Sequence, residues 1–156
     1  MSGPAVTTRT IELEGFEVLV REAGPEGAPP LLCLHGGPGM DSTYFFPDPE
    51  VWGPGLGALA GELRVIAYDQ RGCGGSGVPP VDQPLALSHH VDDIERMRVA
   101  LRLERPAVLA HSFGTVLAIL HALRYPESSS SLILIGCAPT RAARPRPTPA
   151  ACPWTR

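Results

Sequence analysis

Lysine is absent from this chain of 156 residues, and its basic side chains other than histidine are 13 arginines. All 16 acidic residues and nine of the arginines lie in residues 1–136, whereas residues 137–156 carry four arginines and no acid. Together with the 17 glycines and 18 prolines, this composition indicates GC-rich coding bias rather than a nucleic-acid-binding surface. The formal net charge of −3 agrees with that interpretation, and we expect no nucleic-acid partner.

Long apolar runs and metal-binding cysteine spacings are also absent. No segment reaches the roughly 18 apolar residues that a membrane span needs, and the residues after Met1 do not begin a signal peptide. The four cysteines form no C-x-x-C pair and no zinc-type spacing with histidine. We therefore expect a soluble cytoplasmic protein without a membrane partner, a metal or a cofactor.

Short strands alternate with helices along residues 7–135, which predicts a mostly parallel, doubly wound α/β sheet in one domain. The apolar content of 44% is sufficient for a packed core. Strands are expected at 7–13, 16–21, 31–34, 64–68, 107–110 and 132–135, and helices at 56–63, 88–103 and 113–125.

The helix expected over 88–103 has one apolar face. That face is formed by Val91, Ile94, Met97 and Leu101. Ser88 is a suitable N-cap. His89 and His90 in the first turn are expected to face solvent on different sides, so a shared metal is not expected.

The segment Ala107–Thr115 joins a buried strand to a helix through Ala110, Ser112 and Gly114. Its A-x-S-x-G pattern differs by one residue from G-x-S-x-G, in which a strained turn exposes a nucleophilic serine above a sheet. Ala110 adds one methyl group, which we expect a small backbone shift to accommodate. The alternative is that Ser112 is only a helix N-cap.

Three motifs together resemble the proline iminopeptidase group of the α/β-hydrolases: HGGPG at 35–39, DQRGCGGS at 69–76 and AHSFG at 110–114. The resemblance runs from about residue 10 to 136. It implies that Ser112 is the nucleophile and that the backbone N–H groups of Gly37 and Phe113 bind the oxyanion. The implied reaction removes an N-terminal residue, often proline, from a small peptide. Related hydrolases act on esters, lactones or other amides.

The same resemblance implies that the DQRG loop is structural, with Arg71 paired to a carboxylate. Residues 72–77 also fit the dinucleotide-binding pattern G-x-G-x-x-G. That motif must open directly into a helix, and the proline-rich residues 78–84 cannot form one, so we expect no nucleotide site. An epoxide hydrolase or dehalogenase is disfavoured because those enzymes use an aspartate nucleophile where this chain has Ser112.

The catalytic acid and histidine follow the serine in this fold, in that order. After Ser112 the chain contains one histidine, His121 inside the expected helix, and one acid, Glu127 in a Tyr-Pro-Glu turn. We expect neither to act on Ser112. The resemblance places the acid, the histidine and the helical cap in a C-terminal half that the chain lacks, so an almost inactive chain is expected.

Two segments are therefore expected. Residues 1–136 form the N-terminal part of an α/β-hydrolase domain, truncated after about the sixth strand, and residues 137–156 form a basic, proline-rich tail that is disordered or frame-shifted. The alternative function is an inactive fragment, or a chain that binds a partner supplying the missing half. The apolar strand at 132–135 would then be a sheet edge prone to aggregation.

Overall fold

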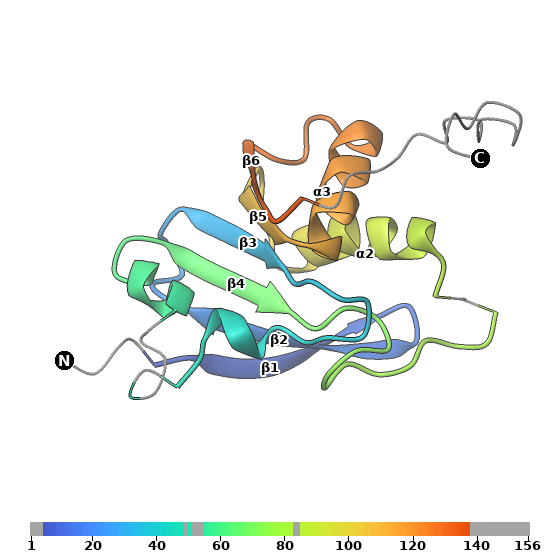
Figure 1. The fold of residues 1–156 in the computed structure, drawn as a ribbon, viewed down its shortest axis with the longest axis horizontal. Helices are drawn as coiled ribbons and strands as arrows, with labels where there is room; N and C mark the ends of the chain where they lie inside the picture. Colours follow the sequence, from blue (N-terminus) through green and yellow to red (C-terminus); the bar gives the residue numbers. More distant parts are fainter. Residues whose placement is uncertain (1–4, 49, 51–54, 83–84, 138–156) are drawn as a thin grey trace, which may run out of the picture.

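The computed structural model describes residues 5–48, 50, 55–82 and 85–137. A single six-stranded sheet forms the centre of the fold (Figure 1). The strands are β1 (Thr7–Leu13), β2 (Phe16–Ala23), β3 (Pro30–Leu34), β4 (Arg64–Tyr68), β5 (Ala107–His111) and β6 (Ser131–Ile135). The helices are η1 (Thr43–Phe45), η2 (Gly55–Leu59), α2 (Leu87–Ala100) and α3 (Phe113–Arg124). Apart from Cys137, the expected tail lies outside the described residues.

The strands lie in the order β1-β2-β4-β3-β5-β6. Strands β1 and β2 form an antiparallel hairpin, and β2 also pairs antiparallel with β4. The pairs β3–β4, β3–β5 and β5–β6 are parallel. This topology confirms the expected mostly parallel α/β sheet. It brings the carboxyl ends of the parallel strands β3, β4 and β5 to the same end of the sheet.

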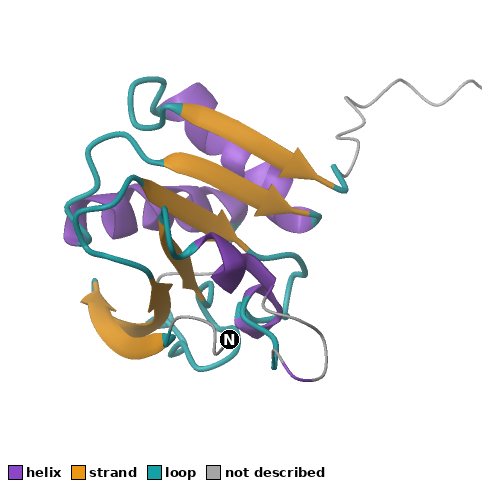
Figure 2. Cartoon of the chain, turned by 90° about the vertical axis from the view of Figure 1, so that its left-hand side faces the viewer, coloured by secondary structure: helices purple, strands orange, loops and turns teal. Residues whose placement is uncertain are grey.

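Alternation along the central strands divides the core between the two faces of the sheet. Leu32 and Leu34 of β3 belong to a cluster that includes residues of α2 and α3, whereas Leu31 and Cys33 belong to a second cluster with Phe45 of η1. Figure 2 shows α2 and α3 on one side of the strands. Both faces of β3 are therefore buried, which explains its uninterrupted apolar sequence.

Helix α2 buries the face predicted from its sequence, but the expectation for His90 is wrong. His90 is 7% exposed, because it precedes Ile94 and Met97 by four and seven residues and so lies on the same helical face. The helix starts at Leu87 after an Ala86 N-cap, so Ser88 is not the cap. Helix η2 is likewise a short 3₁₀ helix, where a longer helix over 56–63 was expected.

Strand β6 forms one edge of the described sheet. Its register pairs it with β5, and Ile133, Leu134 and Ile135 are 45%, 38% and 48% exposed. The described sheet therefore presents an apolar edge, as the sequence predicted, and aggregation through it stays a prediction. Within the described residues, no helix has the length and hydropathy needed to cross a membrane.

Candidate active site

Ser112 occupies a strained turn between β5 and α3. Its backbone has φ 51° and ψ −117°, a conformation that few residues other than glycine adopt and that costs about 1–3 kcal/mol. The Ser112 N–H donates to the carbonyl of Ile135 at 2.9 Å, and the Ser112 carbonyl accepts from the N–H and Oγ1 of Thr115 at 3.0 and 2.6 Å. The Ser112 side chain makes no capping hydrogen bond, which argues against a purely helix-capping role.

Gly114 lets helix α3 approach β3 closely. A Cβ at this position would lie 2.5 Å from the carbonyl oxygen of Leu34 and 2.8 Å from that of His35. Ala110, at the position where the motif has glycine, is fully buried in β5 and pairs in register with Leu34. A side chain larger than that of glycine at Gly114 would therefore meet backbone atoms of β3 and the loop after it.

The glycine-rich loop at 35–39 lies directly against the serine turn. A Cβ on Gly36 would lie 3.1 Å from the Cβ of Ser112 and 3.2 Å from Nδ1 of His111. Gly37, the next residue, has φ 127°, which side chains rarely allow. Phe113 starts α3, so its N–H has no acceptor within the helix. The structure thus places the segments that carry Gly37, Ser112 and Phe113 in contact.

His35 fastens the glycine-rich loop to the loop after β4. Its Nδ1–H donates to the carbonyl of Gly36 at 2.6 Å, and its Nε2 accepts from the N–H of Gln70 at 2.9 Å. Gln70 Nε2 in turn donates to the carbonyl of His35 at 2.8 Å. Burial lowers the pKa of His35, so the ring is neutral with both nitrogens engaged. His35 therefore acts as a brace for the loop.

Asp69 is the first of two buried carboxylates that hold the loop 69–76, and Asp93 is the second. Asp69 is fully buried and accepts from Nη1 of Arg21 at 2.7 Å, from N–H and Oγ of Ser42 at 2.8 and 2.6 Å, and from the N–H of Gly75 at 2.8 Å. This role of Asp69 was not predicted from the sequence. Its position directly after a buried strand was the available signal.

Arg71 pairs with Asp93 of α2, which confirms the expected carboxylate partner. Nε and Nη2 of Arg71 donate to the two carboxylate oxygens at 2.6 and 2.7 Å, and both side chains are buried. The guanidinium also lies over the ring of Phe16, 5.3 Å from its centroid. The residues that follow Arg71 turn back to β2, with Gly77 N–H donating to the carbonyl of Glu17, so the G-x-G-x-x-G stretch opens no helix.

Neither residue that follows Ser112 as a potential base or acid reaches it. His121 lies nine residues further along the sequence, which is about 13 Å along a helix. It is buried, with Nε2 3.2 Å from Oε2 of Glu95. The Glu127 side chain is 90% exposed and pairs loosely with Arg105 at 3.8 Å. His121 is therefore held against Glu95 of α2, and Glu127 faces solvent.

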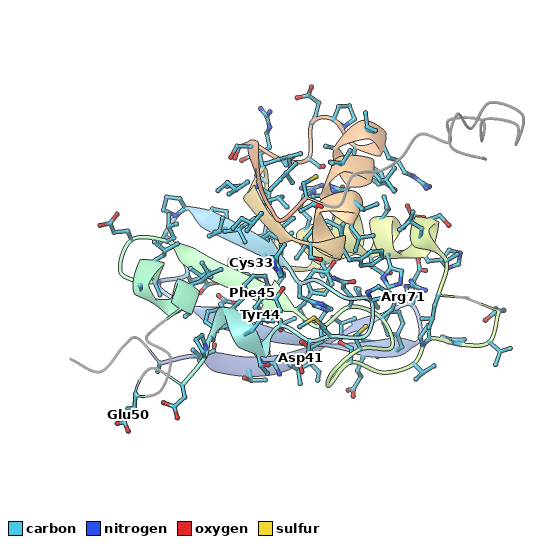
Figure 3. The ribbon with its side chains drawn as sticks, viewed as in Figure 1. Cys33, Asp41, Tyr44, Phe45, Glu50 and Arg71 are labelled. Atoms are coloured by element: carbon cyan, nitrogen blue, oxygen red, sulfur yellow. The ribbon has the colours of Figure 1, made fainter. Side chains whose placement is uncertain are left out.

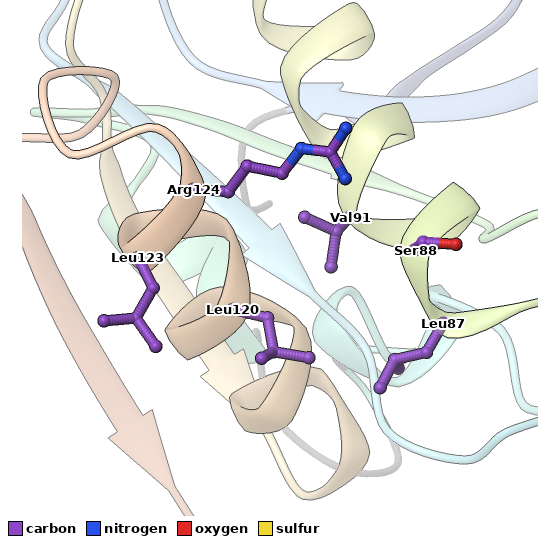
Figure 4. Close-up of a pocket in the computed structure, with 6 residues that line it drawn as sticks. All are labelled: Leu87, Ser88, Val91, Leu120, Leu123 and Arg124. Carbon is purple, nitrogen blue, oxygen red and sulfur yellow. The ribbon is translucent and has the colours of Figure 1, made fainter.

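A pocket of about 660 Å³ adjoins the serine turn. Pro38 and Gly39 of the glycine-rich loop line it together with Phe113 and His90. His90 packs edge-on against the ring of Phe113, and its buried Nδ1 has no hydrogen-bond partner among the described residues. A separate pocket of about 410 Å³ lies between α2 and α3, and the six residues that Figure 4 labels line it.

Three buried histidines predict that acid destabilises the fold. Burial lowers the pKa values of His35, His90 and His121 below their usual 6.5. Below pH 6.5 the unfolded chain binds protons that the folded chain does not, so stability present above that pH is lost as the pH falls toward the folded pKa values. We expect the urea midpoint to fall between pH 7.5 and pH 5.5. An unchanged midpoint would contradict this prediction.

Comparison with known proteins shows the family. The profile described as alpha/beta hydrolase fold matches residues 29–149. Proline iminopeptidases from Heyndrickxia coagulans and Lactobacillus helveticus are 39% and 40% identical over 107 and 126 residues, which is 69% and 77% of this chain but 34% and 40% of theirs. The chain thus spans well under half the length of these relatives.

A solved structure gives the same result. The proline iminopeptidase-related protein from Thermus thermophilus superposes with a TM-score of 0.71 at 33% identity, over 85% of this chain and 45% of that one. A thioesterase domain from the curacin biosynthetic pathway also has a TM-score of 0.71, at 25% identity, over 85% and 47% of the two chains. The chain therefore belongs to the α/β-hydrolase family.

Proposed function

We propose that this chain carries the nucleophile and the oxyanion hole of a serine hydrolase that removes N-terminal residues from peptides. The backbone of Ser112, forced to a positive φ between β5 and α3, is the observation that carries the proposal. Similarity to proline iminopeptidases supports the choice of an amide substrate. Cys33 and Cys73 are buried free thiols. Unpaired thiols are typical of proteins in the reducing cytoplasm, so they support a cytoplasmic location.

In this mechanism Ser112 Oγ attacks the carbonyl carbon of the substrate. The carbonyl oxygen becomes an oxyanion and accepts hydrogen bonds from the backbone N–H groups of Gly37 and Phe113. Collapse of the tetrahedral intermediate breaks the C–N bond, the amine leaves with the proton that the Ser112 hydroxyl gave up to a base, and water later hydrolyses the acyl-serine ester. Loss of one oxyanion donor typically costs about 10²–10³ in rate.

The proton of the Ser112 hydroxyl needs a base. His121 is engaged with Glu95, so no histidine that follows Ser112 in the printed sequence can accept the proton. Loss of the histidine costs a comparable triad about 10⁶ in rate, and an oxyanion hole with binding alone retains about 10³–10⁴ over water. For the chain as printed we therefore expect slow acylation of Ser112 rather than efficient turnover.

Labelling with a fluorophosphonate, followed by intact mass spectrometry and peptide mapping, tests the proposal. We expect one adduct, at Ser112, whose rate rises when imidazole is supplied as an external base. Ser112→Ala should abolish the adduct. Ser130→Ala, which removes an exposed hydroxyl, should leave it unchanged. A folded protein without the adduct at any imidazole concentration, or an adduct that persists in Ser112→Ala, would overturn the proposal in favour of a non-catalytic chain.

A further inference from the structure

We propose that Tyr44 is a positioning residue that holds the two halves of the oxyanion hole in register, an inference that rests on the proposed function. Tyr44 lies on η1, outside every motif in the sequence, and Figure 3 labels it beside Phe45. Its hydroxyl accepts from the N–H of Gly36 at 2.8 Å and lies 3.1 Å from Nδ1 of His111. One side chain thus bridges the glycine-rich loop and the strand that ends at the serine turn.

The direction of the hydrogen bond from Gly36 follows from its donor. A backbone N–H can only donate, so the Tyr44 oxygen accepts from Gly36 and its own proton is available for Nδ1 of His111. Burial raises the pKa of Tyr44, so the hydroxyl keeps this proton at neutral pH.

Packing fixes the ring that carries this hydroxyl. The Tyr44 ring lies 4.5 Å from that of Phe45, which is buried in the core, and meets the His111 ring edge-on at 5.5 Å. The Tyr44 ring therefore contacts one aromatic ring of η1 and one of β5. Because packing already restricts the Tyr44 rotamer, little side-chain entropy is lost when the hydroxyl makes its hydrogen bonds.

The bridge lies next to both proposed oxyanion donors. Gly36 directly precedes Gly37, and His111 directly precedes the Ser112–Phe113 pair. An oxyanion hole works only with its donors about 2.7–3.1 Å from the oxyanion, and a misplacement of about 1 Å costs on the order of 10² in rate. The loop has glycine at 36 and 37, which restrict the backbone little, so the Tyr44 hydroxyl adds to the hold that His35 has on the loop.

Tyr44→Phe tests the proposal, because it removes the hydroxyl and keeps the ring. We expect the limiting rate constant of fluorophosphonate labelling at Ser112 to fall by about 10- to 100-fold, while the probe concentration at half saturation stays unchanged. The matched control is Tyr125→Phe, which removes a hydroxyl that donates to Asp92 at 3.0 Å. The control should label at the wild-type rate.

A second measurement is independent of the chemistry. Hydrogen exchange followed by NMR should show the Gly36 amide protected in the wild type and in Tyr125→Phe, and exchanging at least about tenfold faster in Tyr44→Phe. Equal labelling rates in wild type and Tyr44→Phe would overturn the inference and leave the proposed function standing. If the wild type is not labelled, the proposed function fails, and equal Gly36 exchange in both proteins then overturns the inference separately.

Discussion

Replacing Asp93 with alanine is expected to lower the free energy of unfolding by about 3–5 kcal/mol. The substitution leaves the Arg71 guanidinium buried without the carboxylate that neutralises it, and the Arg71 side chain is 0% exposed. A domain of this size is typically stable by about 5–15 kcal/mol, so the loss is a large fraction of the total. Urea unfolding followed by circular dichroism measures it.

Asp92→Ala is the matched control in the same helix. Asp92 pairs at 3.2 Å with Arg124, whose side chain is 52% exposed, and accepts from the Tyr125 hydroxyl at 3.0 Å, so its loss should cost at most about 2 kcal/mol. A double variant, Arg71→Met with Asp93→Leu, removes both charges and should recover most of the stability that Asp93→Ala loses. Equal losses in the free energy of unfolding for Asp93→Ala and Asp92→Ala would contradict this prediction, because the buried ion pair would then stabilise the fold no more than the exposed one.

The ion pair also has a functional position. Arg71 lines the pocket beside Phe113, and Asp93 anchors it to α2. Loop 69–76 therefore contributes to the shape of the proposed substrate site through a salt bridge that never touches the reacting atoms. Loop 69–76 can match a family motif and still have a structural role, because the wall of a substrate pocket needs side chains that are held in fixed positions.

Local patterns in the sequence predicted the elements that depend on local residues. Continuous apolar runs identified β3 and β4, because these strands are buried on both faces. Glu14 and Gly15 form the expected hairpin turn, with φ values of 44° and 90°. The strained conformation of Ser112 follows from a strand and a helix that meet with one residue between them, and the motif indicated that junction.

Contacts between distant segments could not be predicted in the same way. Tyr44 and His111 are 67 residues apart, and Arg21 and Asp69 are 48 apart, so neither pairing leaves a local pattern. His90 was misplaced because two adjacent polar residues indicate a solvent-facing turn, whereas its spacing to Ile94 indicates burial. His90 is buried because α2 packs that whole helical face against the sheet.

The glycine of the serine motif that matters most for packing is Gly114. Gly114→Ala would place a Cβ 2.5 and 2.8 Å from two carbonyl oxygens at the end of β3, which are backbone atoms that cannot rotate away. Overpacking of this kind costs about 3 kcal/mol at its upper range, and alanine gains about 1 kcal/mol over glycine in a helix. We therefore expect a net loss of about 2 kcal/mol in the free energy of unfolding, measured by urea titration.

The same variant should slow Ser112 labelling by at least about tenfold, since α3 must move away from β3 and carry the Phe113 N–H with it. Gly61→Ala is the control, because a Cβ there would meet nothing within 4 Å, and it should change neither stability by more than about 1 kcal/mol nor labelling. If Gly114→Ala matched Gly61→Ala in both measurements, helix α3 would have room to shift. Close approach of α3 to β3 would then not be what holds Ser112 in its strained conformation.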